Sequence, residues 1–307
     1  MATLLLIDGN AVMHRAYHAL PIFKTKKGIP TNVVFGFFSM LHKAINDFSP
    51  RYLIVCFDTP KPTFRNKLFA KYQAQRPKIV DEFKIQIPKV KEALDKAGIT
   101  HLEKDGFEAD DIIGSIAKKY QNSPLKVLIL SGDKDILQLV EKNVYVAAPQ
   151  NGLSKLIIFD KKEVEKKLGI TPKKIVDYKA LAGDPSDNYI GAKGIGPKTA
   201  TLLINQFGSI ENLFNNLNQV KNQKIKSILE KNKNSVLLGK QLAKIITDLP
   251  LDFDLKKSQF KGFNNNLRTY LLNLEMKTLV NRLFKVKKEV INNKDKNKEN
   301  PPQPSLF

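Results

Sequence analysis

Three apolar runs that each end in an aspartate most constrain the fold of this chain. They are TLLLID (3–8), RYLIVCFD (51–58) and KVLILSGD (126–133). Short, continuous apolar runs are typical of strands buried on both faces, which occur mainly in parallel sheets. Amphipathic segments near 31–48, 85–97 and 108–120 alternate with these runs. The pattern predicts an α/β fold, with a central, mainly parallel sheet flanked by helices.

The rest of the chain reads differently. Beyond residue 160 the strand pattern fades and helical periodicity predominates. Segment 60–90 is basic, aromatic and interrupted by prolines, so we expect an excursion above the sheet. Residues 286–307 carry many charges and few apolar side chains, which predicts a disordered tail. We therefore expect an α/β core over 1–180, a helical region over 181–285 and a tail over 286–307. The predicted later helices are 161–168, 172–182, 197–206, 209–216, 221–230, 233–245 and 265–284.

The charge balance points to a polyanionic partner. The formal net charge is +21, and a protein this basic usually binds nucleic acid. The alternative is a composition rich in lysine and asparagine throughout. A single cysteine, Cys56, excludes an internal disulfide and suits a reducing compartment. No apolar run is long enough to cross a bilayer, and no signal peptide precedes the first strand. We expect a cytoplasmic, nucleoid-associated monomer with no membrane partner.

Acidic residues recur at the predicted strand ends. Because ligands bind beyond the carboxyl ends of strands in open parallel sheets, these acids should converge on one crevice. Without counter-ions they would repel one another, whereas Mg²⁺ takes carboxylate oxygens. Two such ions about 4 Å apart can activate a water and stabilise a leaving oxygen on phosphorus. The nine candidates are Asp8, Asp58, Glu108, Asp110, Asp111, Asp133, Asp135, Asp184 and Asp187.

Each acidic motif alone has a simpler interpretation. A strand-terminal aspartate is often a helix N-cap, GDKD is most often a surface turn, and EADD suits the positive end of a helix dipole. The metal hypothesis rests on four such motifs and one shared expected location.

A glycine-rich hairpin follows the last acids. In GAKGIGPKTA, Gly194 and Gly196 indicate a tight turn between helices, and Pro197 suits the first position of the second helix. Backbone N–H groups at that helix start, with Lys193 and Lys198, would seat a phosphate. An ordinary helical turn would need one glycine, whereas Gly191 makes three here. We expect this hairpin to hold duplex backbone without reading its sequence.

These motifs, in this order, resemble a known family. LLLIDGNAVMHRAYHALP, VCFDTPKPTFRNKLFAKYQAQRP, GFEADDIIGSIA, LSGDKDILQLV and LAGDPSDNYIGAKGIGPKTA are similar to signatures of the 5′→3′ exonuclease domain of bacterial DNA polymerase I, in the flap endonuclease superfamily. The resemblance covers about 1–284. It implies a PIN-like nuclease core, a helical arch at about 60–90 and a helix-hairpin-helix (H3TH) element. It also implies hydrolysis of phosphodiesters at 5′ flaps, nicks and RNA-primer ends with two Mg²⁺ or Mn²⁺ ions.

The resemblance also implies roles for single residues. Asp8, Asp58, Glu108 and Asp110 would hold a first ion, and Asp133, Asp135 and Asp187 a second. Asp111 and Asp184 match acids of an outer shell. In the arch, Arg65 and Arg76 would contact phosphates and Tyr72 could stack on a base. Arg15 falls on a basic position of the family, and the hairpin would also bind K⁺. The DNA contacts implied at the hairpin are Gly191, Lys193, Gly194, Gly196, Lys198 and Thr199.

One position departs from the family pattern. The arch usually reads Tyr-Lys-x-x-Arg, whereas this chain reads YQAQR, with Gln73 in place of the lysine. An amide cannot supply charge near the scissile phosphate, so we expect slower chemistry than in a typical relative. Lys67 or Lys71 could substitute, although residues two apart lie on different faces of a helix.

The C-terminus raises a further hypothesis. No polymerase domain follows Phe307, so we expect a stand-alone nuclease unless the chain is truncated. The last residues, QPSLF, resemble the short peptide by which bacterial proteins dock on the sliding clamp. The residues concerned are Gln303, Ser305, Leu306 and Phe307. The alternative is a chance apolar end to a lysine-rich tail.

Three other readings stay open from the sequence. The first is a catalytically weak or inactive DNA-binding relative, which should have lost some of its acids. The second is an RNA-processing nuclease with a similar acidic sheet, which would usually lack the hairpin. The third is a basic scaffold protein without Mg²⁺-dependent activity.

Overall fold

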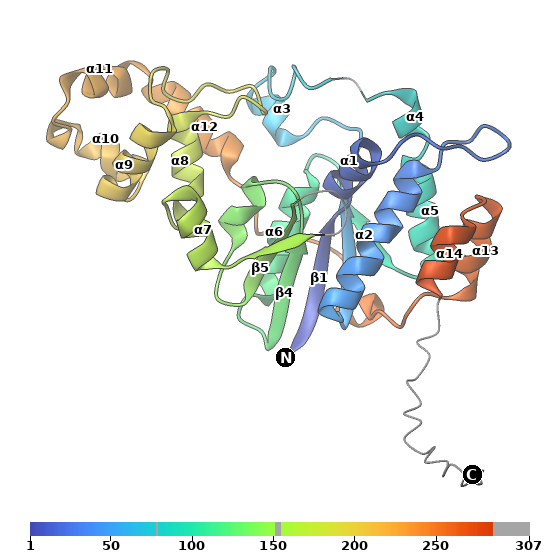
Figure 1. Ribbon diagram of the computed structural model, residues 1–307. Helices are drawn as coiled ribbons and strands as arrows, with labels where there is room; N and C mark the ends of the chain where they lie inside the picture. Colours follow the sequence, from blue (N-terminus) through green and yellow to red (C-terminus); the bar gives the residue numbers. More distant parts are fainter. Residues whose placement is uncertain (78, 151–154, 285–307) are drawn as a thin grey trace, which may run out of the picture.

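The computed structural model describes residues 1–77, 79–150 and 155–284 (Figure 1). The expected tail, with the candidate clamp peptide at 303–307, lies outside the described residues. Among the described residues, no helix combines the length and apolar character that crossing a membrane requires.

A six-stranded sheet forms the centre of the core. The strand order is β3-β2-β1-β4-β5-β6; only β6 runs antiparallel to its neighbour. The three apolar runs form the adjacent strands β2, β1 and β4, which confirms the predicted mainly parallel sheet. The sequence did not single out β3, β5 or β6, which lie toward the edges. The strands are β1 (Ala2–Asp8), β2 (Tyr52–Phe57), β3 (Thr100–Glu103), β4 (Leu125–Leu130), β5 (Val144–Pro149) and β6 (Leu156–Phe159).

Alternate residues of the central strands enter two separate cores. In β1, Leu5 and Ile7 pack on one face of the sheet, whereas Leu4 and Leu6 pack on the other. Strands β2 and β4 divide their side chains in the same way. Because both faces are covered by helices, every position of these strands can be apolar, which explains the continuous runs.

Helices from both ends of the chain cover the first face. They are α1 (Gly9–Ala19), α2 (Asn32–Phe48), α5 (Ile87–Ala97), α13 (Asn265–Asn273) and α14 (Lys277–Leu283). The expectation of one helical DNA-binding region over 181–285 is therefore wrong at its end, because Leu267, Leu271 and Leu279 are buried in the α/β core. The predicted single helix 265–284 is also interrupted, at Glu275, whose φ is +60°.

The other face is covered mainly by α6 (Ala109–Tyr120) and α7 (Lys161–Leu168). Beyond them a separate group of helices forms one end of the molecule (Figure 1). This group has its own apolar core, to which Leu181, Ile204 and Leu229 belong. Its helices are α8 (Ile175–Ala182), α9 (Pro197–Phe207), α10 (Ile210–Asn215), α11 (Gln223–Lys231) and α12 (Lys233–Ala243).

The excursion at 60–90 crosses above the sheet, as expected, between the helical end and the α2 side (Figure 1). Before α5 begins at Ile87, the described residues of this segment form two short helices, α3 (Phe64–Leu68) and α4 (Asp81–Lys84). Turns fill most of the span between them, so the expected helical arch is helical only in part.

Candidate active site

The ends of β1 and β2 place the first acids. Asp8 caps α1, since one carboxylate oxygen accepts a hydrogen bond from the Ala11 amide at 2.9 Å. The other oxygen accepts from the Ser131 hydroxyl at 2.7 Å, beyond the end of β4. Asp58 follows β2 and accepts from the Ala109 amide at 2.7 Å, at the start of α6. These contacts tie the end of β1 to the start of α1 and the end of β4, and the end of β2 to the start of α6.

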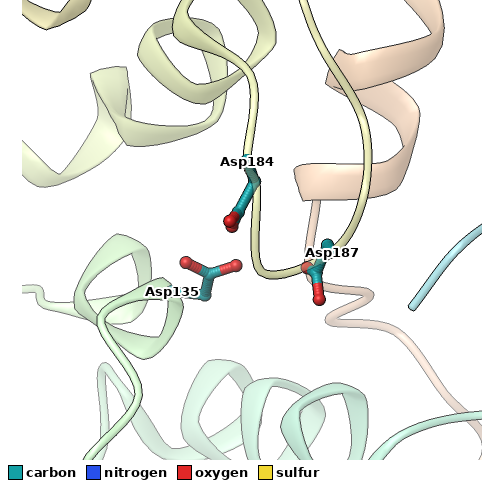
Figure 2. Close-up of side chains that lie close together, drawn as sticks. All are labelled: Asp135, Asp184 and Asp187. Carbon is teal, nitrogen blue, oxygen red and sulfur yellow. The ribbon is translucent and has the colours of Figure 1, made fainter. Parts of the chain in front are cut away.

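A second group of acids lies where the sheet meets the helical end. Carboxylate oxygens of Asp135, Asp184 and Asp187 all lie within 4.8 Å of one another. In Figure 2 the side chain of Asp184 points toward Asp135, and Asp187 lies beside them on the same loop as Asp184. The loop is closed by two backbone hydrogen bonds between Asp184 and Tyr189, of 2.8 and 3.1 Å. A set of carboxylate oxygens this close fits a hard divalent cation.

The two groups form one site. Glu108, Asp110, Asp133, Asp135 and Asp187 line a single cleft. Asp8 and Asp58 lie close enough to Asp110 to act electrostatically on it. The convergence expected from the strand ends is therefore observed for the acids named so far, which come from sequence positions 8 to 187.

Burial and mutual repulsion raise the pKa of most of these carboxyls. Burial, with smaller contributions from Asp58 and Asp133, raises the pKa of Asp8 to about 7. Burial also raises the pKa of Glu108 to about 7, although Arg65 opposes the shift. The pKa of Asp110 lies well above its usual value, because of burial first and then Asp133 and Asp8. Such a cluster binds a cation favourably, since a cation removes the repulsion.

The second group carries a positive side chain of its own. The Lys179 ammonium on α8 contacts carboxylate oxygens of both Asp135 and Asp184. Burial raises the pKa of Asp135 to about 7 even with this ion pair. For Asp184, burial is outweighed by Lys179 and Ser186, and the pKa is lowered. Lys179 was not among the residues predicted from the sequence.

The arch lies against Asp187. The Arg76 guanidinium contacts one Asp187 oxygen at 2.8 Å, and the Gln73 amide donates to the same oxygen at 3.1 Å. The Tyr72 hydroxyl lies 3.3 Å from the other oxygen and 3.4 Å from Glu108. Tyr72 is buried, so in this conformation it cannot stack on a base as expected. Lys67 is exposed on α3.

Arg65 occupies a different place from the expected one. Its side chain is 3% exposed, and its guanidinium forms two hydrogen bonds to Asp111, of 2.8 and 2.9 Å. It also contacts Glu108 at 3.2 Å and donates to the backbone carbonyls of Leu242 and Lys244 at 2.9 Å. These four hydrogen bonds and the ion pair with Glu108 occupy the buried guanidinium, so it is not available to a DNA phosphate in this conformation. The expected phosphate contact is corrected to a structural ion pair.

Asp111 is the partner in this ion pair and not a cleft residue. It is fully buried, and its oxygens also accept from the amides of Glu108 and Ile246 at 3.1 and 2.9 Å. It therefore supports the start of α6, which carries Glu108 and Asp110, and does not face the cleft.

The hairpin has the geometry that its glycines indicate. Gly191 has a φ of +63°, and an added Cβ would lie 2.6 Å from the Leu181 carbonyl oxygen. Gly196 caps α9, which begins at Pro197. Lys193 and Lys198 are exposed on either side of this turn, and Thr199 is partly exposed. Exposed backbone amides and lysines at one helix start can accept a phosphate.

Arg15 lies on α1, outside the acidic cleft. Its guanidinium donates to the backbone carbonyl of Gln150 at 2.5 Å. Sequence reasoning missed three residues near the site: Ser131, Lys179 and Tyr189. Only Ser131 had a local signal, since it follows an apolar run directly and precedes Asp133.

Comparison with known proteins identifies the family. The model of the 5′-3′ exonuclease N-terminal, resolvase-like domain matches residues 3–169, and that of the C-terminal SAM fold matches residues 170–266. A 5′-3′ exonuclease of Aquifex aeolicus is 42% identical over 287 residues, which are 93% of this chain and 96% of the relative. The chain belongs to the 5′-3′ exonuclease family. The resemblance stated from the motifs, and the prediction of an enzyme, are confirmed, and the scaffold reading is excluded.

Other relatives are longer. DNA polymerase I of Bacillus subtilis is 38% identical over 281 residues, which cover 91% of this chain but 32% of the polymerase. This 5′-3′ exonuclease therefore spans about a third of the length of the polymerases that it matches. Two solved structures share its fold: a bacteriophage T5 5′-exonuclease with zinc (TM-score 0.68, 19% identity) and a T5 flap endonuclease with DNA and metal ions (0.65, 19%). Each match covers 92% of this chain and 96% of the other.

The raised pKa values predict how stability depends on pH without divalent ions. Asp8, Glu108 and Asp135 have folded-state pKa values of about 7, against ordinary values of 3.8 to 4.5. Between pH 4 and 7 the folded state therefore holds more protons than the unfolded state. The contribution of these carboxyls to the free energy of unfolding is therefore fully present below their ordinary pKa values. It is lost as the pH rises through their folded-state pKa of about 7. Urea unfolding in a chelator should give a lower free energy at pH 8 than at pH 5. A higher free energy of unfolding at pH 8 than at pH 5 would contradict the raised pKa values of these three carboxyls.

Proposed function

We propose that this 5′-3′ exonuclease is a structure-specific nuclease that cuts 5′ flaps, nicked duplex and RNA-primer ends during replication and repair. One observation carries the proposal: acids from distant segments line one cleft together with residues of the arch-like excursion. The solved flap endonuclease complex with DNA, similar in fold, supports the substrate class. Such an enzyme would act in the bacterial cytoplasm, at the nucleoid, and the cleft requires no second copy of the chain.

The carboxylates would hold two divalent ions, Mg²⁺ or Mn²⁺. Asp8, Asp58, Glu108 and Asp110 form the group assigned to one ion, and Asp133, Asp135 and Asp187 the group assigned to the other. Asp184, expected in an outer shell, is added to the second group because its oxygens lie close to those of Asp135 and Asp187. When bound, such ions activate water and stabilise the developing charge of an in-line displacement at phosphorus. The products would carry a 5′ phosphate and a 3′ hydroxyl.

The basic residues would position the DNA. The hairpin around Gly191, Gly194 and Gly196 would hold the duplex backbone through amides, assisted by Lys193, Lys198 and Thr199. Its backbone carbonyls would also bind K⁺. Arg15 would add a contact from α1. Arg76 is half exposed on the arch and would exchange Asp187 for a phosphate. Because Tyr72 is buried, its stacking role would require the arch to move.

Gln73 offers a test of the arch. Its amide touches Asp187, so a lysine there would bring a positive charge to the same point. We expect Gln73→Lys to raise the single-turnover cleavage rate by about tenfold, since a charge near the scissile phosphate stabilises the transition state. Gln75→Lys is the matched control, because the exposed Gln75 amide donates to the Pro185 carbonyl and not to a carboxylate. An unchanged rate for Gln73→Lys would remove the hypothesis.

The terminal peptide is proposed to dock on a sliding clamp. Gln303, Ser305, Leu306 and Phe307 lie outside the described residues, so the proposal rests on the sequence. Deleting 303–307 should reduce binding to the clamp of the same organism by at least tenfold, while cleavage of free flap DNA stays unchanged. Equal clamp binding by the full chain and the deletion would refute the proposal.

The function is tested with a panel of labelled substrates. A 5′-flap DNA, a nicked duplex with an RNA 5′ end and a structured RNA are incubated with and without Mg²⁺. We expect Mg²⁺-dependent cleavage of the first two and little of the third. Cleavage of the structured RNA alone would favour the RNA-processing alternative, and no Mg²⁺-dependent cleavage would favour an inactive relative.

A further inference from the structure

Tyr189 is a buried side chain that the site described so far does not use. It follows Asp187 by two residues, and 5% of its surface is exposed. Its ring packs with Tyr72, Leu242 and Ala243 in a small apolar cluster. The ring alone accounts for the burial, and a phenylalanine would fill the same space.

Packing explains why the Tyr189 ring is buried, but it does not explain why the ring carries a hydroxyl. It is one of four buried polar side-chain atoms among the described residues that have no hydrogen-bond partner. A buried hydroxyl without a partner costs about 1–3 kcal/mol relative to a paired one. A tyrosine at this position therefore indicates that the hydroxyl meets a polar group that is not part of the protein.

The surroundings identify that group by its chemistry. After burial, the side chains that act most strongly on the Tyr189 hydroxyl are Lys179, Asp135, Asp184 and Asp187. Three of these are the clustered acids of the second group, and the fourth is their ammonium partner. The paired backbone hydrogen bonds to Asp184 fix Tyr189 relative to this cluster. The buried hydroxyl thus lies within electrostatic reach of the Asp135–Asp184–Asp187 cluster and forms no hydrogen bond with the described residues.

We propose that Tyr189 is a positioning residue for a hydrated divalent ion held by Asp135, Asp184 and Asp187. Its hydroxyl would form a hydrogen bond with a water molecule of that ion. The inference rests on the proposed function, since it takes these acids as ligands. Mg²⁺ and Mn²⁺ sites commonly keep several waters, and a hydroxyl can donate to or accept from such a water. Tyr189 would thereby strengthen ion binding without itself contacting the substrate.

The test is a titration of the full chain with Mn²⁺, in which the electron paramagnetic resonance signal of free Mn²⁺ gives the bound fraction. Tyr189→Phe keeps the ring and removes only the hydroxyl. We expect one class of Mn²⁺ sites to weaken by about five- to tenfold, the size of effect that follows the loss of one ordinary hydrogen bond, while the other class is unchanged. Without ions, the melting temperature should be unchanged or higher.

A kinetic measurement separates positioning from packing. For Tyr189→Phe, the Mg²⁺ concentration that gives half-maximal cleavage should rise by a similar factor, while the rate at saturating Mg²⁺ stays within about twofold. Tyr145→Phe is the control, because its hydroxyl donates to the Lys142 carbonyl at 3.1 Å on the surface. It should change neither Mn²⁺ binding nor cleavage.

The outcomes distinguish this inference from the proposed function. If Asp135→Asn and Asp184→Asn weaken Mn²⁺ binding but Tyr189→Phe leaves every class unchanged, the role of Tyr189 is overturned and the metal assignment stands. If the wild-type chain binds no Mn²⁺, or the aspartate variants bind it as the wild type does, both are overturned.

Discussion

Replacing Asp133 with alanine is expected to lower the Mg²⁺-dependent cleavage rate by about 10²- to 10³-fold, the size of effect that follows the loss of one transition-state-stabilising group. Asp133 lines the cleft, and its charge acts on Asp8 and Asp110. It is exposed, so its loss leaves no cavity. Removing one of several repelling charges should leave the melting temperature unchanged or raise it. Single-turnover cleavage of a 5′-flap DNA measures the rate, and thermal unfolding measures the melting temperature.

Asparagine at the same position isolates the charge. The Asp135 amide donates to Asp133 at 2.8 Å, and an asparagine oxygen could still accept this hydrogen bond. Asp133→Asn should therefore be nearly as inactive as Asp133→Ala. Asp47→Asn is the control, since Asp47 is a surface acid paired with Lys43 at 2.9 Å. Full activity of Asp133→Asn would show that the charge is not required and would undermine the metal assignment.

Replacing Arg65 with methionine is expected to lower the free energy of unfolding by about 3–5 kcal/mol, because it leaves a buried carboxylate without its partner. Asp111 is fully buried, and Arg65 also satisfies the carbonyls of Leu242 and Lys244. Urea unfolding measures the loss. Any fall in DNA binding should then follow the folded fraction and should be largely recovered at low temperature.

Two further variants sharpen this test. Lys43→Met breaks an exposed ion pair and should change the free energy by less than about 1 kcal/mol. Arg65→Met combined with Asp111→Leu removes both buried charges and should be more stable than Arg65→Met alone. A fully stable Arg65→Met protein with weakened DNA binding would restore the phosphate-contact reading.

What could be predicted from the sequence depended on local signals. The runs ending at Asp8, Asp58 and Asp133 carry their own evidence, since continuous apolar residues indicate a parallel sheet and its strand ends share one edge. The central strands and most of the site followed from this. The short edge strands carry no comparable run. For example, β3 is four residues long and includes His101 and Glu103.

The misassigned residues depend on contacts between distant segments. Arg65 looked like a phosphate ligand because its acceptors, Leu242 and Lys244, lie more than 170 positions away. Helical periodicity likewise predicts a helix but does not tell which apolar core the helix packs into. For this reason α13 and α14 were assigned to the wrong region. Lys179 and Tyr189 lie on segments whose local pattern is that of an ordinary helix and loop.

The return of α13 and α14 to the sheet has a consequence for dividing the molecule. The second family match stops at residue 266, just before Leu267, Leu271 and Leu279, which are wholly buried. A fragment cut at that boundary would leave α2 and α5 with uncovered apolar surface and would tend to associate or aggregate. The nuclease core and the hairpin are therefore not separable by one cut, since the chain leaves the sheet, forms the helical end and then returns to complete the core with α13 and α14.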